Sequence, residues 1–284
     1  MTLREFRPTG HAWLEIASRL LQSARLAEPS GGLWEAADLQ WWWRLDQHPD
    51  PDGQSIWAEG SKPVVAVAFN RWKDWIGCDL LGPDTAVEKH ADPLWARVRT
   101  RFTDEPISMT IRDDDADRTA AAERAGFVAG DDTYATAWMA AEDRPALPRL
   151  PPGVRVRSYG GGAHPMIARS GPHVAERLAE CSLYRPDLDL AVVDGDSVAG
   201  YALFWADPVT GVGLLEPMRI EASHQGRGLS KALLAIGLDR LAAAGCTRLK
   251  VTFDPSNEPA ARLYTGAGYR VQFISRTWTR PARA

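Results

Sequence analysis

A short segment with two glycines is the part of the chain best suited to chemistry. It reads QGRGLS (residues 225–230), after an apolar run over 214–220 and directly before a strongly helical segment, 229–244. A glycine-rich turn that opens a helix directs several free backbone N–H groups toward one point, with the positive end of the helix dipole behind them. Such backbone groups can hold a pyrophosphate. We therefore expect this turn to bind the phosphates of a nucleotide-like cofactor.

Titratable and polar residues flank this turn on both sides. Glu216 lies on the apolar run that leads into it, whereas Glu221 and His224 lie on the short link and are expected to face solvent. Asn257 precedes Glu258-Pro259 and is suited to cap a helix, a role that can coexist with ligand binding. Tyr264 follows at helical spacing and is either a core aromatic residue or a proton donor.

Composition narrows the classes of protein. The chain has 284 residues, 45% of them hydrophobic, which predicts a soluble globular protein of about two domains. A formal net charge of −4 offers no basic excess for nucleic acid or an anionic membrane. No apolar stretch resembles a signal peptide or approaches the roughly 18 residues of a membrane span. The three cysteines have no metal-ligand spacing, and their odd number argues against a disulfide framework. We expect a cytoplasmic protein without a metal site.

The elements that must position these residues can be read from the second half of the chain. Strand candidates over 188–193 and 198–205 flank Asp194-Gly195-Asp196, a strong hairpin signal. A strand over 213–220 leads into the glycine turn, and the helix over 229–244 has one broad apolar face. The other expected elements are strands over 154–159, 248–253, 269–273 and 275–279 and a helix over 257–265.

The first half of the chain repeats this order in outline. Its expected elements are strands over 3–6, 55–58, 64–69, 75–81, 107–111 and 134–140 and helices over 12–26, 86–102 and 116–125. The segment 109–127 aligns with 251–269 without a gap, so that Gly126 falls on Gly268. Residues 141–153 contain four prolines and predict an extended linker. These observations favour a tandem duplication with one domain over 1–140 and a second over 154–284.

The second half resembles the GNAT superfamily of acyl-CoA-dependent N-acetyltransferases. The family signature at a strand–turn–helix matches Gln225, Gly228 and Ser230, although serine replaces the usual glycine or alanine at the last place. A second family feature, downstream, matches Asn257, Leu263-Tyr264 and Gly268-Tyr269. The resemblance covers about residues 154–280. It implies an α/β fold of two tandem GNAT-like domains, each a central mixed, mostly antiparallel sheet flanked by helices, with the N-terminal copy degenerate.

The resemblance also implies a cofactor, acetyl-CoA or another acyl-CoA, and the residues that hold it. The backbone of Met218, Arg219 and Ile220 would pair with the pantetheine arm, where Pro217 would help disrupt regular strand pairing. The amides of Gly226, Arg227, Gly228, Leu229 and Ser230 would hold the pyrophosphate, aided by the Arg227 or Lys231 side chain. Asn257 would face the cofactor arm, and Tyr264 would protonate the leaving thiolate. Glu216 is the candidate base, because some family members use a glutamate on this strand.

The first half lacks these features. Gly82 stands alone where the glycine turn should be, and the alignment of the two halves places Ala122 on Tyr264 and Asp115 on Asn257. We therefore expect the first half to bind no CoA and to serve as a scaffold or as a wall of the acceptor site. The Trp41-Trp42-Trp43 run is interpreted as core packing, with an aromatic substrate wall as the alternative. The Gly160-Gly161-Gly162 run is expected to be a loop that borders the acceptor site.

Two functions are compatible with these residues. The first is an N-acetyltransferase that moves an acyl group from acyl-CoA to a primary amine, which we expect to belong to a small molecule. Positioning the amine against the thioester would supply much of the acceleration, so few side chains are needed. The second is a non-catalytic acyl-CoA-binding sensor or interaction module. Asn257 and Tyr264 favour the enzyme.

Overall fold

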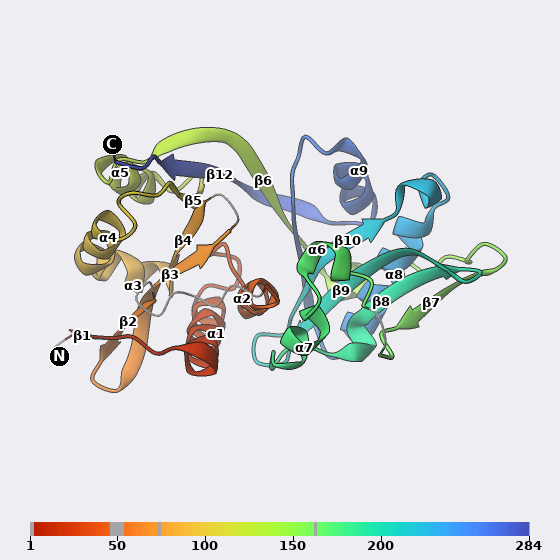
Figure 1. Ribbon diagram of the computed structural model, residues 1–284. Coiled ribbons are helices and arrows are strands. Elements are labelled where there is room, and N and C mark those ends of the chain that lie inside the picture. The colour runs from red at the N-terminus through yellow and green to blue at the C-terminus, as the bar shows by residue number, and fades with distance from the viewer. Residues whose placement is uncertain (1–2, 46–53, 73–74, 162–163, 284) are drawn as a thin grey trace. The chain divides into compact units, whose positions relative to one another are not determined.

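The computed structural model describes residues 3–45, 54–72, 75–161 and 164–283 (Figure 1). The chain forms two compact units. The N-terminal unit comprises Met1–Trp42, Gln47–Tyr134 and Phe273–Ala284, and the C-terminal unit comprises Trp43–Asp46 and Ala135–Gln272. Each unit is a mixed sheet with helices on its faces.

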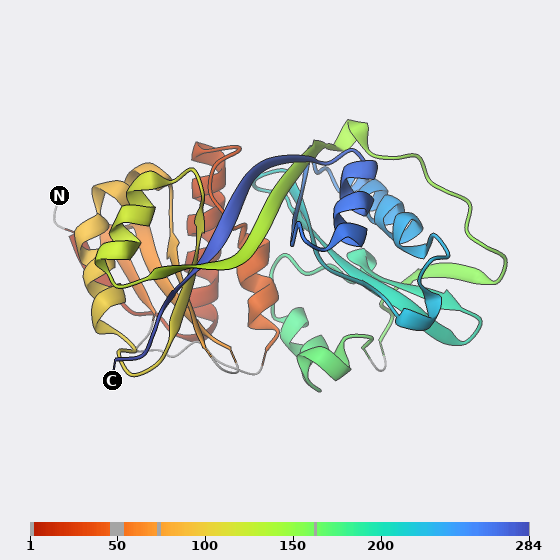
Figure 2. The ribbon, with the colours of Figure 1, turned by 90° about the horizontal axis from the view of Figure 1, so that it is seen from above.

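The sheet of the N-terminal unit is mostly antiparallel, with one parallel pair between β4 and β5. Its strands in sheet order are β1 (Leu3–Phe6), β2 (Ser55–Glu59), β3 (Lys62–Arg71), β4 (Ile76–Leu81), β5 (Ile107–Arg112) and most of β12 (Arg270–Arg280). Its helices are α1 (Gly10–Ala27), α2 (Ala36–Trp43), α3 (Asp84–Lys89), α4 (Ala91–Thr100) and α5 (Ala116–Arg124). Helix α1 covers one face, and α4 and α5 cover the other (Figure 2).

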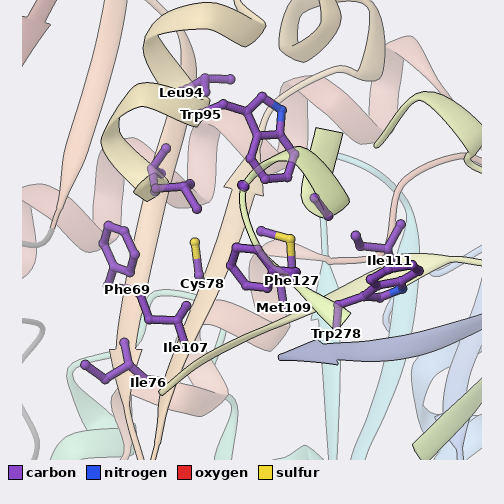
Figure 3. Close-up of a cluster of buried hydrophobic side chains, with 14 of the residues drawn as sticks. Phe69, Ile76, Cys78, Leu94, Trp95, Ile107, Met109, Ile111, Phe127 and Trp278 are labelled. Atoms are coloured by element: carbon purple, nitrogen blue, oxygen red, sulfur yellow. The ribbon is translucent and has the colours of Figure 1, made fainter. Parts of the chain in front are cut away.

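A dense apolar core lies between this sheet and helices α4 and α5. Figure 3 shows Leu94 and Trp95 of α4 above Cys78, Met109 and other residues of the strands. Trp278, near the end of the chain, belongs to the same cluster. Burial of Trp278, together with the pairing of β12 with β5, joins the C-terminal strand to the N-terminal unit.

The C-terminal unit has the corresponding sheet. Its strands in sheet order are the second part of β6 (Val128–Ala140), then β11 (Arg248–Phe253), β10 (Val212–Ile220), β9 (Ser197–Asp207), β8 (Asp189–Asp194) and β7 (Val154–Ser158). Its helices are α6 (Ile167–Ser170), α7 (Val174–Ala179), α8 (Leu229–Ala243) and α9 (Glu258–Gly266), with 3₁₀ turns at Ala141–Asp143, Pro186–Leu188 and Ala222–His224. Helices α8 and α9 lie on one face of this sheet, and α6 and α7 lie on the other (Figure 2).

The units exchange strands, so their boundaries differ from the expected domains 1–140 and 154–284. Residues 135–140 of β6 pair with β11 in the C-terminal unit, and residues 275–280 of β12 pair with β5 in the N-terminal unit. Each sheet is completed by a strand from the other half of the sequence. The proline-rich segment over 141–153 belongs to the C-terminal unit, where Arg144 forms an ion pair with Asp239 at 2.9 Å.

Four expected elements also have different bounds. The expected helix over 86–102 is two helices, because the ring of Pro93 would clash with the carbonyl group of Lys89, the last residue of α3. The expected strands over 269–273 and 275–279 form one strand, β12, and β6 begins at Val128 rather than at 134. Within the described chain, no helix combines the length and the apolar character needed to cross a membrane.

The duplication is visible in the strand register. In the N-terminal unit β4 and β5 pair only at Ile76–Gly77 with Ile107–Ser108, and in the C-terminal unit β10 and β11 pair only at 212–214 with 248–250. Among the described residues, the two parallel neighbours have no further backbone pairing in either unit. Asp115 and Asn257, which the alignment of the two halves superposes, each cap the helix that follows.

Candidate functional site

The glycine turn opens helix α8 as the sequence predicts. Gly226 and Gly228 both have a φ of 75°, a left-handed conformation that strongly favours glycine, and Gly228 is the N-cap of α8. A Cβ atom added at either glycine would meet no atom within 4 Å. The backbone of the turn therefore borders open space, and a ligand can approach it closely.

The amides of this turn are available to a ligand. Within the described chain, no N–H group from Gly226 to Ser230 donates a hydrogen bond to a protein acceptor. The Leu229 side chain is buried and anchors the start of α8, so Leu229 can contribute only its amide. The helix is held against β9, where Gly237 packs on the ring of Phe204. A rigid helix start with open amides has the geometry of an anion site.

Polar side chains form hydrogen bonds at the glycine turn, and basic side chains lie near it. The Gln225 side-chain amide donates to the carbonyl oxygen of Ile220 at 3.1 Å. The Arg227 guanidinium donates to Asp194 Oδ2 at 2.6 Å, and His224 Nε2 lies 3.8 Å from the same oxygen. Lys231 is exposed and forms no hydrogen bond or ion pair in the described chain, so its ammonium group remains available.

Strand β10 separates from β11 just before the turn. The register of β10 against β9 shifts between Leu215 and Met218, and after the shift Met218 to Ile220 pair with β9 alone among the described strands. Their other backbone edge faces the split between β10 and β11. Met218 and Ile220 are half-buried, whereas Arg219 is exposed and lies 3.6 Å from Glu221. An extended ligand could add its own backbone-like hydrogen bonds to this edge.

Helix α9 supplies the remaining predicted residues. Asn257 is its N-cap, and the Asn257 side-chain oxygen accepts from the Ala260 amide at 3.2 Å. Tyr264 is buried, with its ring 5.2 Å from that of Phe253 and 6.1 Å from that of Tyr269. Burial and the nearby charge of Glu216 raise the pKa of Tyr264 to about 12. The Tyr264 phenol is therefore protonated at neutral pH and can donate a proton.

Glu216 lies at the register shift of β10, where the strands separate. Trp205 Nε1 donates to the Glu216 carbonyl oxygen at 2.9 Å, which holds the backbone at this point. The Glu216 side chain is half-buried and acts electrostatically on both Tyr264 and Arg44. The structure thus brings together Glu216 and Tyr264, which lie far apart in the sequence.

Arg44 is a member of this group that the sequence did not reveal. It follows α2 and belongs to the C-terminal unit, and its Nε donates to Ser170 Oγ at 3.2 Å. Burial lowers the pKa of Arg44 to about 10, while the charges of Glu216 and Tyr201 act to raise it. No local motif marks Arg44, because its partners come from distant elements.

Other candidate residues are engaged elsewhere. Glu221 forms ion pairs with Arg169 at 3.5 Å and with Arg219 at 3.6 Å. Trp41 and Trp43 are buried, and Trp43 Nε1 donates to Glu180 at 2.7 Å, so this aromatic run contributes to packing. In the glycine run, Gly160 and Gly161 border open space, and Gly162 lies outside the described residues.

The corresponding turn in the N-terminal unit is built differently. Gly82 has a φ of 137°, and a Cβ atom added there would lie 2.8 Å from the carbonyl oxygen of Val64. Asp84 begins the following helix, so a carboxylate lies where a phosphate would need positive charge. Ala122, the counterpart of Tyr264, is fully buried. The N-terminal turn therefore lacks the open double-glycine geometry of residues 226–228.

Comparison with known proteins agrees with this geometry. Residues 164–269 match the family model described as the acetyltransferase (GNAT) family, and this range contains the glycine turn, Glu216, Asn257 and Tyr264. The chain therefore carries a GNAT-family domain. The GNAT resemblance stated from the sequence is confirmed.

Two relatives extend the comparison beyond this segment to part of the chain. A mycothiol acetyltransferase from Tsukamurella paurometabola is 30% identical over 45% of this chain and 52% of its own length. Another, from Kineococcus radiotolerans, is 28% identical over 67% of each chain. The match to the first of these relatives thus spans about half of that protein's length.

The fold over the full length is that of tandem GNAT proteins. A tandem GNAT protein from the clavulanic acid biosynthesis pathway matches 100% of this chain and 99% of its own, with a TM-score of 0.70 and 14% identity. A GCN5-related N-acetyltransferase from Sphaerobacter thermophilus covers 99% of this chain and 96% of its own, with a TM-score of 0.61 and 17% identity. The expected α/β fold of two GNAT-like domains is confirmed.

Proposed function

We propose that the C-terminal unit transfers an acetyl group from acetyl-CoA to a primary amine of a small molecule. One observation carries the proposal. The open glycine turn follows the edge of β10 that β11 leaves unpaired, and Glu216, just before that edge, acts electrostatically on Tyr264.

The residues of the turn fit the pyrophosphate of acetyl-CoA. The amides from Gly226 to Ser230 would bind its oxygens, and the Arg227 and Lys231 side chains would add positive charge. The free edge from Met218 to Ile220 would receive the amide groups of the pantetheine arm, with Asn257 facing that arm. When bound, acetyl-CoA supplies an acyl group activated as a thioester.

The proton transfers would fall to the residues at the split. Glu216 would accept the proton of the attacking amine, either directly or through one water molecule. Tyr264, whose phenol is protonated at neutral pH, would donate its proton to the departing sulfur. Arg44 would keep Glu216 in position by its charge.

A small-molecule acceptor is favoured over a macromolecule. The chain has a formal net charge of −4, which offers no general attraction for nucleic acid. The relatives named mycothiol acetyltransferase support an acceptor of low molecular mass.

The three cysteines are free and buried, which is consistent with a protein of the reducing cytoplasm.

The test is thiol release from acetyl-CoA across a panel of small primary amines, with Tyr264→Phe and a matched Tyr134→Phe variant in the N-terminal unit. We expect at least one amine to accelerate release, and Tyr264→Phe to lower kcat by about 10²-fold with acetyl-CoA affinity retained. Tyr134→Phe should match the wild type. If acetyl-CoA binds but no amine accelerates release, the non-catalytic acyl-CoA-binding module is the correct function. If Tyr264→Phe retains full kcat, Tyr264 is not the acid.

A further inference from the structure

The N-terminal unit has a cavity of its own at the split between β4 and β5. It has a volume of about 30 Å³, room for a few non-hydrogen atoms. Its walls come from the end of α1 and the segment after it, from β4 and β5, and from two charged side chains near the starts of α3 and α5. Among the lining residues are Arg25, Glu28, Trp34, Asp79, Asp84 and Arg118.

Asp79 is the central group of this cavity. It lies two residues after Gly77, which is the last residue of β4 that pairs with β5. Glu216 has the same position in the C-terminal unit, two residues after Leu214, the last residue of β10 that pairs with β11. The N-terminal unit therefore retains a carboxyl group at the place of the proposed catalytic base. It does so in a unit that has lost the phosphate turn.

The two oxygens of Asp79 differ in their partners. The residue is only 9% exposed, and its Oδ1 accepts from Trp34 Nε1 at 2.8 Å. Within the described chain, Oδ2 accepts no hydrogen bond. Burial and the charge of Asp38 raise the pKa of Asp79 to about 7, although the bond from Trp34 acts to lower it. Because Asp79 lines the cavity, its second oxygen is available to a hydrogen-bond donor that enters it.

The cavity also has an excess of acidic groups. Arg25 is paired with Glu35 at 2.6 Å, and Arg118 is paired with Asp84 at 2.9 Å. Arg118 Nε also lies 3.2 Å from Asp115. Both arginines are thus already neutralised by carboxylates.

Because both arginines are paired with other carboxylates, the carboxyl groups of Asp79 and Glu28 form no ion pair with a basic side chain among the described residues. Burial and the charge of Asp84 raise the pKa of Glu28 as well. A positive charge in the cavity would relieve this repulsion.

We propose that this cavity is a binding site for a small ammonium ion or the protonated end of a primary or secondary amine, held by Asp79. The unused Asp79 oxygen would accept an N–H bond, and the indole of Trp34, which lines the cavity, would contact the ammonium group. Phosphate-bearing ligands are disfavoured by the single glycine of the Gly82 turn and by the carboxylate of Asp84. A metal ion is disfavoured because the described residues contain no group of three His, Cys, Asp or Glu arranged to hold one.

The site makes a specific prediction about pH. An ammonium ion binds the ionised form of Asp79, so affinity should rise as pH increases through about 7. The titratable and charged groups that surround Asp79 are, by element, Asp38 from α2, Arg25 and Glu28 from α1 and its end, Cys78 from β4, Asp84 from α3, and Arg118 from α5. Guanidinium groups stay charged over this range, and ionisation of Glu28 acts in the same direction as that of Asp79. Affinity should therefore be about tenfold greater at pH 8 than at pH 6, following the ionised fraction of Asp79.

The test uses the full chain labelled with ¹⁵N-tryptophan and follows the indole N–H signal of Trp34, identified with Trp34→Phe. Methylammonium chloride should shift this signal in a saturable way, whereas tetramethylammonium, which has no N–H donor, magnesium chloride and sodium acetate should not. Asp79→Asn should abolish the saturable shift. Two results with the wild-type protein would each overturn the proposal. One is an equal shift of the Trp34 signal with methylammonium and tetramethylammonium, and the other is the absence of a saturable shift with methylammonium at pH 8. Because the readout is binding in the N-terminal unit, its result is independent of acetyl transfer.

Discussion

Tyr264 and Glu216 lie on different elements, α9 and β10, yet the charge of Glu216 contributes to the raised pKa of the phenol. The sequence could propose Glu216, Tyr264, Asn257 and the glycine turn, because each lies on a single element that the GNAT resemblance covers, and their roles stay predictions. Arg44 could not be predicted in this way. Its position near Glu216 depends on how the segment after α2 folds into the C-terminal unit.

The pKa of Tyr264 predicts the alkaline side of the pH–rate profile. An ordinary tyrosine loses its proton near pH 10, whereas burial and Glu216 raise the pKa of Tyr264 to about 12. Since the acid acts in its protonated form, its contribution is lost only as pH rises through about 12. We expect kcat at saturating acceptor to stay level up to about pH 10.5. A fall to half the plateau value near pH 10 that Tyr264→Phe abolishes would contradict this assignment.

At the scale of elements, helix α8 is held so close to β9 that only glycine fits at position 237. A Cβ atom added to Gly237 would lie 1.9 Å from Cζ of Phe204, so α8 or the ring would have to move. The sequence pattern predicted the existence of α8 and of β9 but not this contact. Packing distance between elements is not encoded in the periodicity of either one.

The substitution Gly237→Ala should destabilise the protein, because overpacking costs about 1–3 kcal/mol or more. The matched control is Gly266→Ala, also in a helix, where an added Cβ atom would meet nothing within 4 Å. The control should be neutral or stabilising by up to about 1 kcal/mol. Urea unfolding measures the change in the free energy of unfolding for both variants. Equal midpoints for the two variants would contradict the close packing of α8 on β9.

At the scale of the whole molecule, the exchanged strands are the feature that the sequence did not predict. The duplication, the order of elements and the proline-rich segment were all readable from local patterns and from the alignment of 109–127 with 251–269. Strands β6 and β12 have the composition of ordinary strands, and nothing in that composition indicates which sheet each one joins. Pairing over long sequence separations is decided by the packed structure, as with Trp278 in the N-terminal core.

Strand exchange predicts that the two halves cannot be separated at the linker. A protease site introduced within residues 145–152 should give two fragments that remain associated, because each sheet would lose a strand if they parted. Gel filtration of the cut protein should show one species at the mass of the intact chain, with separation only in denaturant. Two folded, independently eluting fragments would show that the exchanged strands are dispensable.

The central claim is that one acyl-CoA binds to the glycine turn of the C-terminal unit, and calorimetric titration with acetyl-CoA tests it most directly. Gly228→Glu would place bulk and negative charge in the turn. Gly245→Glu is the matched control, since Gly245 also has a positive φ and open space but follows the other end of α8. We predict one acetyl-CoA per chain for the wild type and for Gly245→Glu, and none for Gly228→Glu. Two equivalents per wild-type chain, or undiminished binding to Gly228→Glu, would contradict the account.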